Sequence, residues 1–265
     1  MARNEMRVLM VGDIVGPSGV RALFLQLGGL RARVRADLVV ANVENAAGGY
    51  GLTPAIADEL TGVGVDVMTS GNHIWQQREI WKRLDEDERL LRPHNYPEGP
   101  PGRGTALLDT PVGKLGVLNL EGRVGMANLR DPIRVGEAEV ARLRATARAI
   151  VVDFHAESLD EKEAFALRLD GKVSAVVGTH THVQTADERI LSGGTAFLGD
   201  LGMTAPPASA IGMQMQTSID RSLSQMPLKL TADDAPAAIC GALVVIDAES
   251  GRARSIERIH QPPTL

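Results

Sequence analysis

The sequence has little of three features that mark particular classes of protein. Cys240 is the only cysteine among 265 residues, so no internal disulfide bond can form, as is usual in a reducing compartment. No stretch approaches the roughly 18 apolar residues of a membrane-spanning helix. The N-terminal residues lack the apolar run of a signal peptide. We therefore expect a cytoplasmic protein with no membrane partner.

Excess positive charge is also missing. The net charge is −5 and the isoelectric point is about 5.7, which argues against a surface that binds nucleic acid through bulk charge. Aromatic residues make up only 3% of the chain, so Val, Leu, Ile and Ala must fill the core. A chain of this length can bury a substantial core, and we expect one domain over residues 1–265.

Short apolar runs alternate with amphipathic segments along the chain. The expected strands are 6–12, 37–43, 65–69, 114–120, 149–154, 173–177 and 196–200, with a hairpin over 238–260. The expected helices are 17–35, 53–63, 76–87, 137–148 and 160–169. This alternation predicts an α/β fold with parallel strands and helices on both faces. The segment from about Met203 to Leu230, rich in Met, Gly, Pro and Ser, is expected to be a cap or contact surface.

Nearly every expected strand ends in a side chain that could bind a metal ion. These side chains belong to Asp13, Glu44, Asn45, Asn72, His155, His180 and His182. In α/β sheets, the carboxyl ends of the strands form one rim, where ligands bind. Taken singly, each residue has an ordinary explanation as a helix cap, a turn residue or a core histidine. Together they predict a metal centre, because a carboxylate after a strand buried on both faces, as at Glu44, needs a partner.

The number and type of these ligands indicate two ions. Seven nitrogen and oxygen ligands exceed the four of a structural zinc site. They suit a pair of ions about 3.5–4 Å apart that share one carboxylate. The absence of a cysteine ligand excludes iron–sulfur sites, and the oxygen ligands favour iron or manganese. His180 and His182 stand two residues apart, and on an extended segment they would point to the same face.

Six motifs together resemble the YmdB family of bacterial metallophosphoesterases over essentially the whole chain. They are VGDIVGPSGVRAL (11–23), VANVENAAGGYGLT (40–53), TSGNHIW (69–75), RPHNYP (92–97), VDFHAE (152–157) and GTHTHVQTAD (178–187). The resemblance implies a calcineurin-like metallophosphoesterase fold, with layered β-sheets flanked by helices and a metal site at the carboxyl ends of the strands. Val15 replaces the histidine of the generic superfamily motif, and Val43-Glu44-Asn45 replaces its Gly-Asp-x-x-Asp block. Protein phosphatase or nuclease activity is therefore not carried over.

The resemblance also implies the chemistry of the site. One ion would be held by Asp13, Glu44, Asn45 and His182, and the other by Glu44, Asn72, His155 and His180. The expected cofactors are two divalent or trivalent ions, iron or alternatively manganese. The expected reaction is hydrolysis of a small cyclic nucleotide, 2′,3′-cyclic NMP to 3′-NMP, by a metal-bridging hydroxide. His73 is the candidate general acid, with support of the metal ligands as its alternative role. The family also implies a homo-oligomer.

Other interpretations remain open. Tyr50 and Trp75 could stack on a base or simply pack in the protein. A metal-dependent amidohydrolase also uses a His-x-His pair, but usually on the first strand of a barrel. The other alternative is a metal-binding regulatory or RNA-metabolism-associated protein with weak phosphodiesterase activity.

Overall fold

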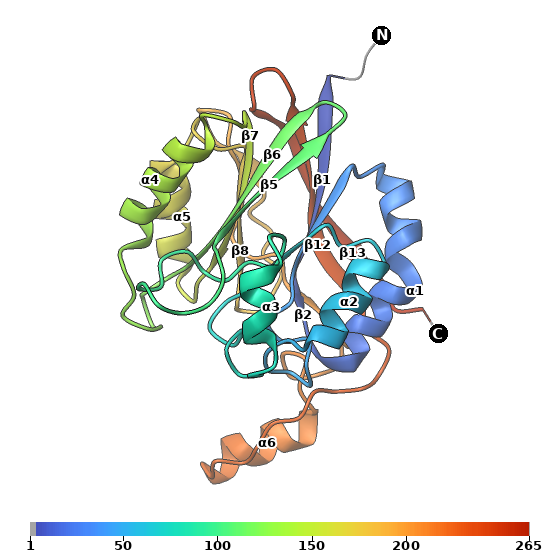
Figure 1. The fold of residues 1–265 in the computed structure, drawn as a ribbon. Coiled ribbons are helices and arrows are strands. Elements are labelled where there is room, and N and C mark those ends of the chain that lie inside the picture. The colour runs from blue at the N-terminus through green and yellow to red at the C-terminus, as the bar shows by residue number, and fades with distance from the viewer. Residues whose placement is uncertain (1–3, 265) are drawn as a thin grey trace.

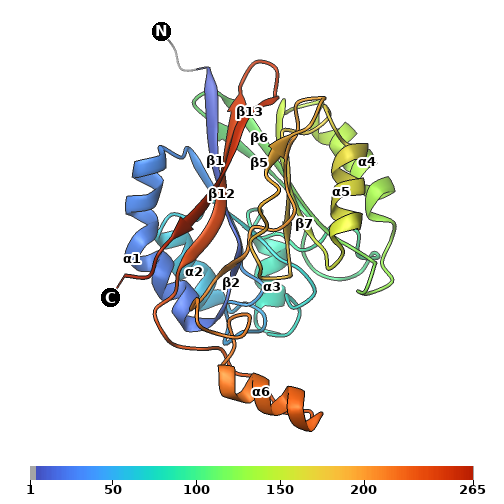
Figure 2. The same ribbon diagram turned by 180° about the vertical axis from the view of Figure 1, so that it is seen from behind.

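Two stacked β-sheets lie between two layers of helices in the computed structural model, which describes residues 4–264 (Figures 1 and 2). The first sheet has the strand order β13-β12-β1-β3-β4. Its strands are β1 (Glu5–Val11), β3 (Leu38–Asn42), β4 (Val67–Thr69), β12 (Ile239–Asp247) and β13 (Ala253–Gln261). β1, β3 and β4 are parallel, whereas β12 pairs antiparallel with both β1 and β13.

The second sheet has the order β5-β6-β7-β8-β10-β9. Its strands are β5 (Thr105–Thr110), β6 (Gly113–Glu121), β7 (Ala149–His155), β8 (Ala175–Thr179), β9 (Arg189–Ile190) and β10 (Ala196–Leu198). β6, β7, β8 and β10 are parallel. A short third sheet joins β2 (Asp13–Ile14) to β11 (Met203–Thr204). The carboxyl ends of the parallel strands of both large sheets therefore point to the same end of the molecule (Figure 1).

Successive side chains of a strand point to opposite faces of its sheet, and they therefore contribute to separate hydrophobic cores. In β1, Met6, Val8 and Met10 pack between the two sheets, whereas Leu9 and Val11 pack against the helices outside the first sheet. In β7, Val151 belongs to the core between the sheets and Val152 to the core under the outer helices. Both large sheets are covered on both faces in these regions, which explains why their strands are continuous apolar runs.

Helices cover the outer faces of the two sheets, and one further helix projects from the body. They are α1 (Gly16–Val34), α2 (Pro54–Gly62), α3 (Ile80–Glu86), α4 (Pro132–Leu143), α5 (Leu159–Arg168) and α6 (Met215–Ser224). α1 and α2 flank the first sheet and α4 and α5 the second (Figure 1). α6 buries none of its residues and stands away from the body (Figures 1 and 2). No helix within residues 4–264 is long and apolar enough to cross a membrane.

The predicted α/β fold of layered sheets flanked by helices is confirmed, with local corrections. α4 begins at Pro132 rather than Glu137, because the Asp131 side chain accepts hydrogen bonds from the backbone of Ile133 and Arg134 and caps the helix there. α3 covers only Ile80–Glu86, so the expectation of a helix from residue 76 was wrong. β5 was not anticipated. The strands are not all parallel, since β5 and β12 run against their neighbours.

A buried ion pair connects α5 to the end of β10. The Lys162 ammonium lies 2.8 Å from the Asp200 carboxylate, and both side chains are 1% exposed. The same carboxylate accepts hydrogen bonds from the backbone and hydroxyl of Thr181 and from the backbone of Gly202. The pair therefore joins the outer helix layer to the loop that follows β8.

We predict that Lys162→Met destabilises the protein by about 3–5 kcal/mol, because it leaves the Asp200 charge buried without its counter-ion. Urea unfolding of the metal-free protein measures the loss. Lys172→Met is the matched control, since Lys172 is a half-exposed lysine paired with Glu137 at the surface. The control is expected to cost under about 1 kcal/mol. Equal unfolding midpoints for the two variants would contradict the role assigned to Lys162.

Candidate metal centre

All seven predicted ligands come together at the carboxyl ends of the strands. Asp13 begins β2, two residues after the end of β1, Glu44 and Asn45 follow β3, and Asn72 follows β4, so the chain at the carboxyl edge of the first sheet supplies four of them. The second sheet supplies the other three, His155 at the end of β7 and His180 and His182 after β8. The cluster thus lies where the two sheets meet, and neither sheet could form it alone.

One side of the cluster contains Asp13, Asn45 and His182. The His182 Nε2 atom lies 3.8 Å from Asp13 Oδ1 and 3.2 Å from Asn45 Nδ2. Asn45 Nδ2 also lies 3.3 Å from Glu44 Oε1. An oxygen ligand from Asn45 would require the opposite orientation of this amide.

The other side contains Asn72, His155 and His180. The His155 Nε2 atom lies 3.0 Å from Glu44 Oε1, 3.2 Å from Asn72 Oδ1 and 3.1 Å from His180 Nδ1. Glu44, His155 and His180 present ligand atoms that all lie within 4.8 Å of one another. Glu44 is the residue in contact with both sides of the cluster.

Two observations show that the cluster suits a cation. Asp13 is fully buried, yet its Oδ1 atom has no hydrogen-bond partner, which is costly for a carboxylate oxygen without a positive ion nearby. Gly71 leaves room beside the cluster, because a Cβ atom there would overlap the His155 ring and approach Glu44 Oε2. With only nitrogen and oxygen atoms offered, the donor set fits iron, manganese or a similar ion.

The shifts in pKa also reflect crowding of charges. Burial raises the pKa of Asp13 to about 6, although His182 and His155 oppose it. Burial also acts against ionisation of Glu44 and His155, but their mutual attraction outweighs it, so the pKa of Glu44 falls to about 2 and that of His155 rises to about 9. The two form a buried ion pair. A cation that takes both as ligands would release the His155 proton.

A buried network that the sequence did not reveal orients His155. The Thr179 hydroxyl donates to Asp153 at 2.7 Å and lies 2.9 Å from His155 Nδ1. Because the hydroxyl hydrogen goes to Asp153, its oxygen accepts the hydrogen on Nδ1, and this leaves Nε2 to face the cluster. Asn42 and Thr69 also donate to Asp153. The one signal in the sequence was an aspartate inside an apolar run.

His180 and His182 do not lie on an extended segment, and that expectation was wrong. Their φ angles of 101° and 66° place both in the left-handed region, which costs a non-glycine residue of the order of 1–3 kcal/mol. Hydrogen bonds hold the turn. Thr181 donates twice to Asp200, and the His180 backbone donates to Asp13 at 3.1 Å. The buried pair of Lys162 and Asp200 thereby stabilises the turn that carries both histidines.

His73 lies beside the cluster, as its position after Asn72 predicted. Its backbone N–H donates to Glu44 Oε2 at 3.0 Å, and its Nδ1 atom lies 2.8 Å from the Gln76 amide nitrogen. The ring packs edge-on against Tyr50, with centroids 5.2 Å apart. Burial lowers the pKa of His73, although Glu44 opposes the shift. The His73 side chain therefore lies close to the cluster, although His73 is not one of the seven predicted metal ligands.

The cluster opens into a pocket of about 370 Å³. Glu44, Asn45, His180 and His182 line one part of it, together with His73 and Glu157. The carboxylate of Glu157 lies 3.2 Å from His180 Nε2. Tyr50 reaches this pocket, whereas Trp75 packs against Tyr96. A small molecule could therefore reach the cluster from solvent.

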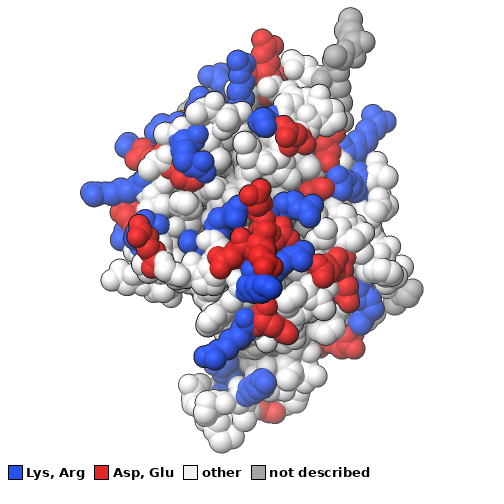
Figure 3. Space-filling view, viewed as in Figure 1, with Lys and Arg blue, Asp and Glu red and all other residues white. Residues whose placement is uncertain are grey.

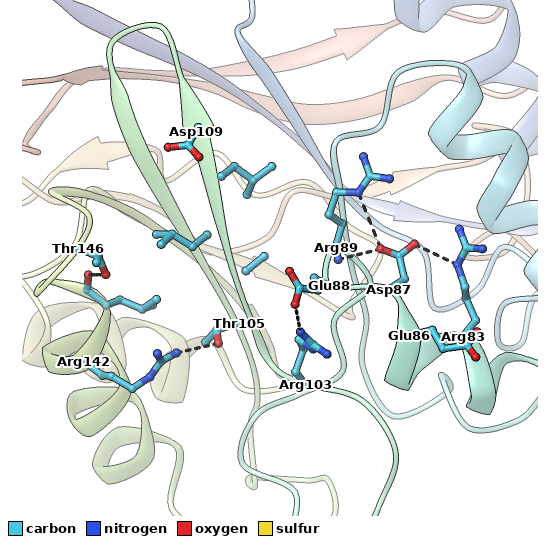
Figure 4. Close-up of a pocket in the computed structure, with 14 residues that line it drawn as sticks. Arg83, Glu86, Asp87, Glu88, Arg89, Arg103, Thr105, Asp109, Arg142 and Thr146 are labelled. Atoms are coloured by element: carbon cyan, nitrogen blue, oxygen red, sulfur yellow. Dashed lines mark hydrogen bonds and ion pairs between the residues drawn. The ribbon is translucent and has the colours of Figure 1, made fainter.

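A second hollow of about 960 Å³ lies between α3 and β5 (Figure 4). Charged side chains of both signs line this hollow. On the face of the molecule drawn in Figure 3, acidic side chains likewise gather near the middle, with basic side chains around them. In the hollow, Arg83 pairs with Asp87 and Arg103 pairs with Glu88 (Figure 4). Because these charges neutralise each other, the hollow is a weaker candidate for an anionic substrate than the pocket at the cluster.

Known proteins resemble this chain over nearly its full length. The family model described as YmdB-like protein matches residues 9–259. The 2′,3′-cyclic-nucleotide 2′-phosphodiesterase of Bacillus subtilis is 40% identical over 254 residues, which cover 96% of each chain.

Solved structures agree with this result. A hypothetical protein from Thermus thermophilus has a TM-score of 0.90 at 39% identity and covers 97% of this chain and 100% of its own. A structure described as a novel phosphatase from Mycoplasma pneumoniae has a TM-score of 0.91 at 29% identity, with coverage of 98% and 95%. A Staphylococcus aureus protein assigned as a 5′-nucleotidase, at 12% identity and a TM-score of 0.62, shares the fold alone, covering 98% of this chain and 55% of its own. The resemblance seen in the sequence motifs is confirmed, and the chain belongs to the YmdB-like family.

Proposed function

We propose that the protein is a metal-dependent phosphodiesterase that converts 2′,3′-cyclic nucleotides to 3′-nucleotides. The observation that carries this proposal is the buried cluster of nitrogen and oxygen ligands at the base of a pocket, with Asp13 Oδ1 unsatisfied. The 40% identity to the Bacillus subtilis enzyme supports the choice of substrate. Turnover of 2′,3′-cyclic AMP by protein loaded with iron or manganese tests the proposal, with the product identified by chromatography.

In this proposal the seven residues hold two ions. Asp13, Asn45 and His182 would hold one, Asn72, His155 and His180 the other, and Glu44 would contact both, as its position between the two sides allows. Such ions lower the pKa of water towards neutrality and withdraw charge from a phosphate group. The buried network behind His155 keeps its Nε2 directed at the cluster, and the turn at Thr181 keeps both other histidines in place.

We assign His73 the role of general acid. When water adds to phosphorus, the bond to the ribose 2′ oxygen breaks, and that oxygen is a poor leaving group that needs a proton. His73 lines the pocket next to Glu44 and Asn45 and can deliver a proton there. For this step Gln76 would turn its amide oxygen towards Nδ1, since an imidazolium donates from both nitrogens.

Three further parts of the proposal concern the protein in the cell. Iron is the expected metal, with manganese as the alternative, because imidazole and oxygen ligands suit both. A cytoplasmic location fits a chain with a single cysteine. A homo-oligomer fits the exposed apolar side chains of Met215, Ile219 and Leu223 on α6, which no part of the described chain covers.

We predict that His73→Ala lowers kcat on 2′,3′-cyclic AMP by about 10²–10⁴-fold, the usual contribution of a general acid. Bis-p-nitrophenyl phosphate has a good leaving group that needs no proton, so its turnover is expected to fall far less. Steady-state kinetics with both substrates on the metal-loaded variant provide the comparison. Equal losses on the two substrates would remove the acid role and leave His73 as support for the ligands.

We also predict that Gly71→Ala prevents normal metal binding, because the added Cβ would overlap the His155 ring, which is fully buried and cannot move aside. Gly28→Ala is the matched control, since a Cβ at this position in α1 meets nothing within 4 Å. Metal content after dialysis, measured by mass spectrometry, should fall below one ion per chain for Gly71→Ala and stay at the wild-type value for the control. A Gly71→Ala protein with full metal content would show that the His155 side of the cluster is not a ligand site.

A further inference from the structure

The pocket at the metal centre has two chemically different halves. Four of the proposed ligands, together with His73 and Glu157, supply its polar and charged part, and Tyr50, Ile211, Met213 and Leu230 supply its mostly apolar part. Three of these four come from the segment of 203–230 that the sequence indicated as a cap or contact surface. That segment thus contributes a wall of the pocket as well as the protruding helix α6.

The wall is fixed to the metal centre. The carbonyl of Ile211 lies 2.8 Å from His182 Nδ1 and accepts its hydrogen. Ala210 and Met213 exchange two backbone hydrogen bonds of 2.9 Å, and Gln214 donates to Thr231. Met213 is 5% exposed and packs against Val15. The wall is therefore in place before any ligand binds.

Ile211 is exposed and strained at the same position. The residue is 53% exposed although its side chain is apolar, and its φ of 49° lies in the left-handed region. A β-branched residue is rare in this conformation, which Gly, Asn and Asp adopt far more easily. Stability alone would favour one of those residues. Ile211 lines the pocket at the metal centre and also a hollow beside α6, so its exposed side chain is available for contact with a ligand in the pocket.

The wall offers mainly apolar contact, and the Tyr50 hydroxyl is the one side-chain hydroxyl among its four residues. The backbone N–H groups of Gly49, Tyr50 and Met213 already donate to Asn45, Ala47 and Ala210. Every nucleobase has an apolar face that can pack on such a surface, whereas discrimination between bases needs hydrogen bonds to their edges. A pocket of about 370 Å³ lies within the range of small-molecule sites.

We propose that Tyr50, Ile211, Met213 and Leu230 form the subsite for the base of the cyclic nucleotide. The inference rests on the proposed function and adds to it the way in which the nucleoside part is recognised. The base packs on the apolar wall while the cyclic phosphate faces the metal ligands and His73. Because recognition is by contact and not by hydrogen bonds to the base edges, the four common bases are accepted with KM values within about threefold of one another.

The test uses Ile211→Asn, which removes the apolar contact and suits the left-handed backbone, so that the variant folds at least as well as the wild type. For 2′,3′-cyclic AMP, KM is expected to rise about tenfold with kcat nearly unchanged. For ribose 2,3-cyclic phosphate, which has no base, KM is expected to be high in the wild type and unchanged by the substitution. Ile190→Asn is the control, since Ile190 is an exposed apolar residue of β9 that does not line the pocket.

Equal KM values for the substrates with and without the base, or an unchanged KM for 2′,3′-cyclic AMP in Ile211→Asn, would overturn the subsite and leave the proposed function standing. Absence of turnover of either substrate would overturn the proposed function. In that case calorimetric titration of the metal-loaded protein with 3′-AMP and with ribose 3-phosphate still decides the subsite. Tighter binding of 3′-AMP that is lost in Ile211→Asn supports it, and equal binding of the two ligands rejects it.

Discussion

A carboxylate buried between two sheets is the constraint on which the rest of this structure depends. Glu44 is 1% exposed and follows β3, yet its partners come from β7 and from the loops after β3 and β4. A buried charge of this kind is tolerated only if positive or hydrogen-bonding groups surround it. The fold satisfies Glu44 by stacking two sheets so that their carboxyl ends meet, and this brings four histidines to one place.

Hydrogen bonds around the cluster compensate for backbone strain in the segments that form it. Two histidines and an isoleucine near the pocket have left-handed backbones. For the histidines, the hydrogen bonds from Thr181 and the buried pair of Lys162 and Asp200 counteract the strain. Asp153 accepts hydrogen bonds from side chains of three strands and orients His155 through Thr179. Much of the polar interior of this protein therefore serves the position of a few ring nitrogens.

The sequence predicted the parts of the site that depend on local pattern. Polar residues directly after apolar runs mark strand ends, so Asp13, Glu44, Asn72 and His155 could be named without coordinates. The motifs, through their family resemblance, supplied the layering of the sheets. Asp153 and Thr179 were missed because they lie inside buried strands, where a polar residue has no periodic signal. The start of α4 was missed because the cap at Asp131 was overlooked.

Properties set by distant contacts had no local signal at all. The turn at His180 is imposed by Asp13 and Asp200, which are far away in sequence, and an extended segment was the wrong expectation. The position of Ile211 in the pocket depends on the hydrogen bond between its carbonyl and His182. The sequence around Ile211 predicted only an irregular segment. Long-range hydrogen bonds, and not the local conformational propensities of the residues, determine the turn at His180 and the position of Ile211.

The division of the ligands between the two sheets has a consequence for the behaviour of the whole chain. Residues 13–72 supply one part of the cluster and residues 155–182 the other, with the second sheet's first strands between them in sequence. A pair of ions held there, as proposed above, would act as a cross-link between the early and late parts of the polypeptide. The two sheets could then separate only if the ions were released, so in the metal-loaded protein the slowest amide hydrogens to exchange should be those of both sheets together.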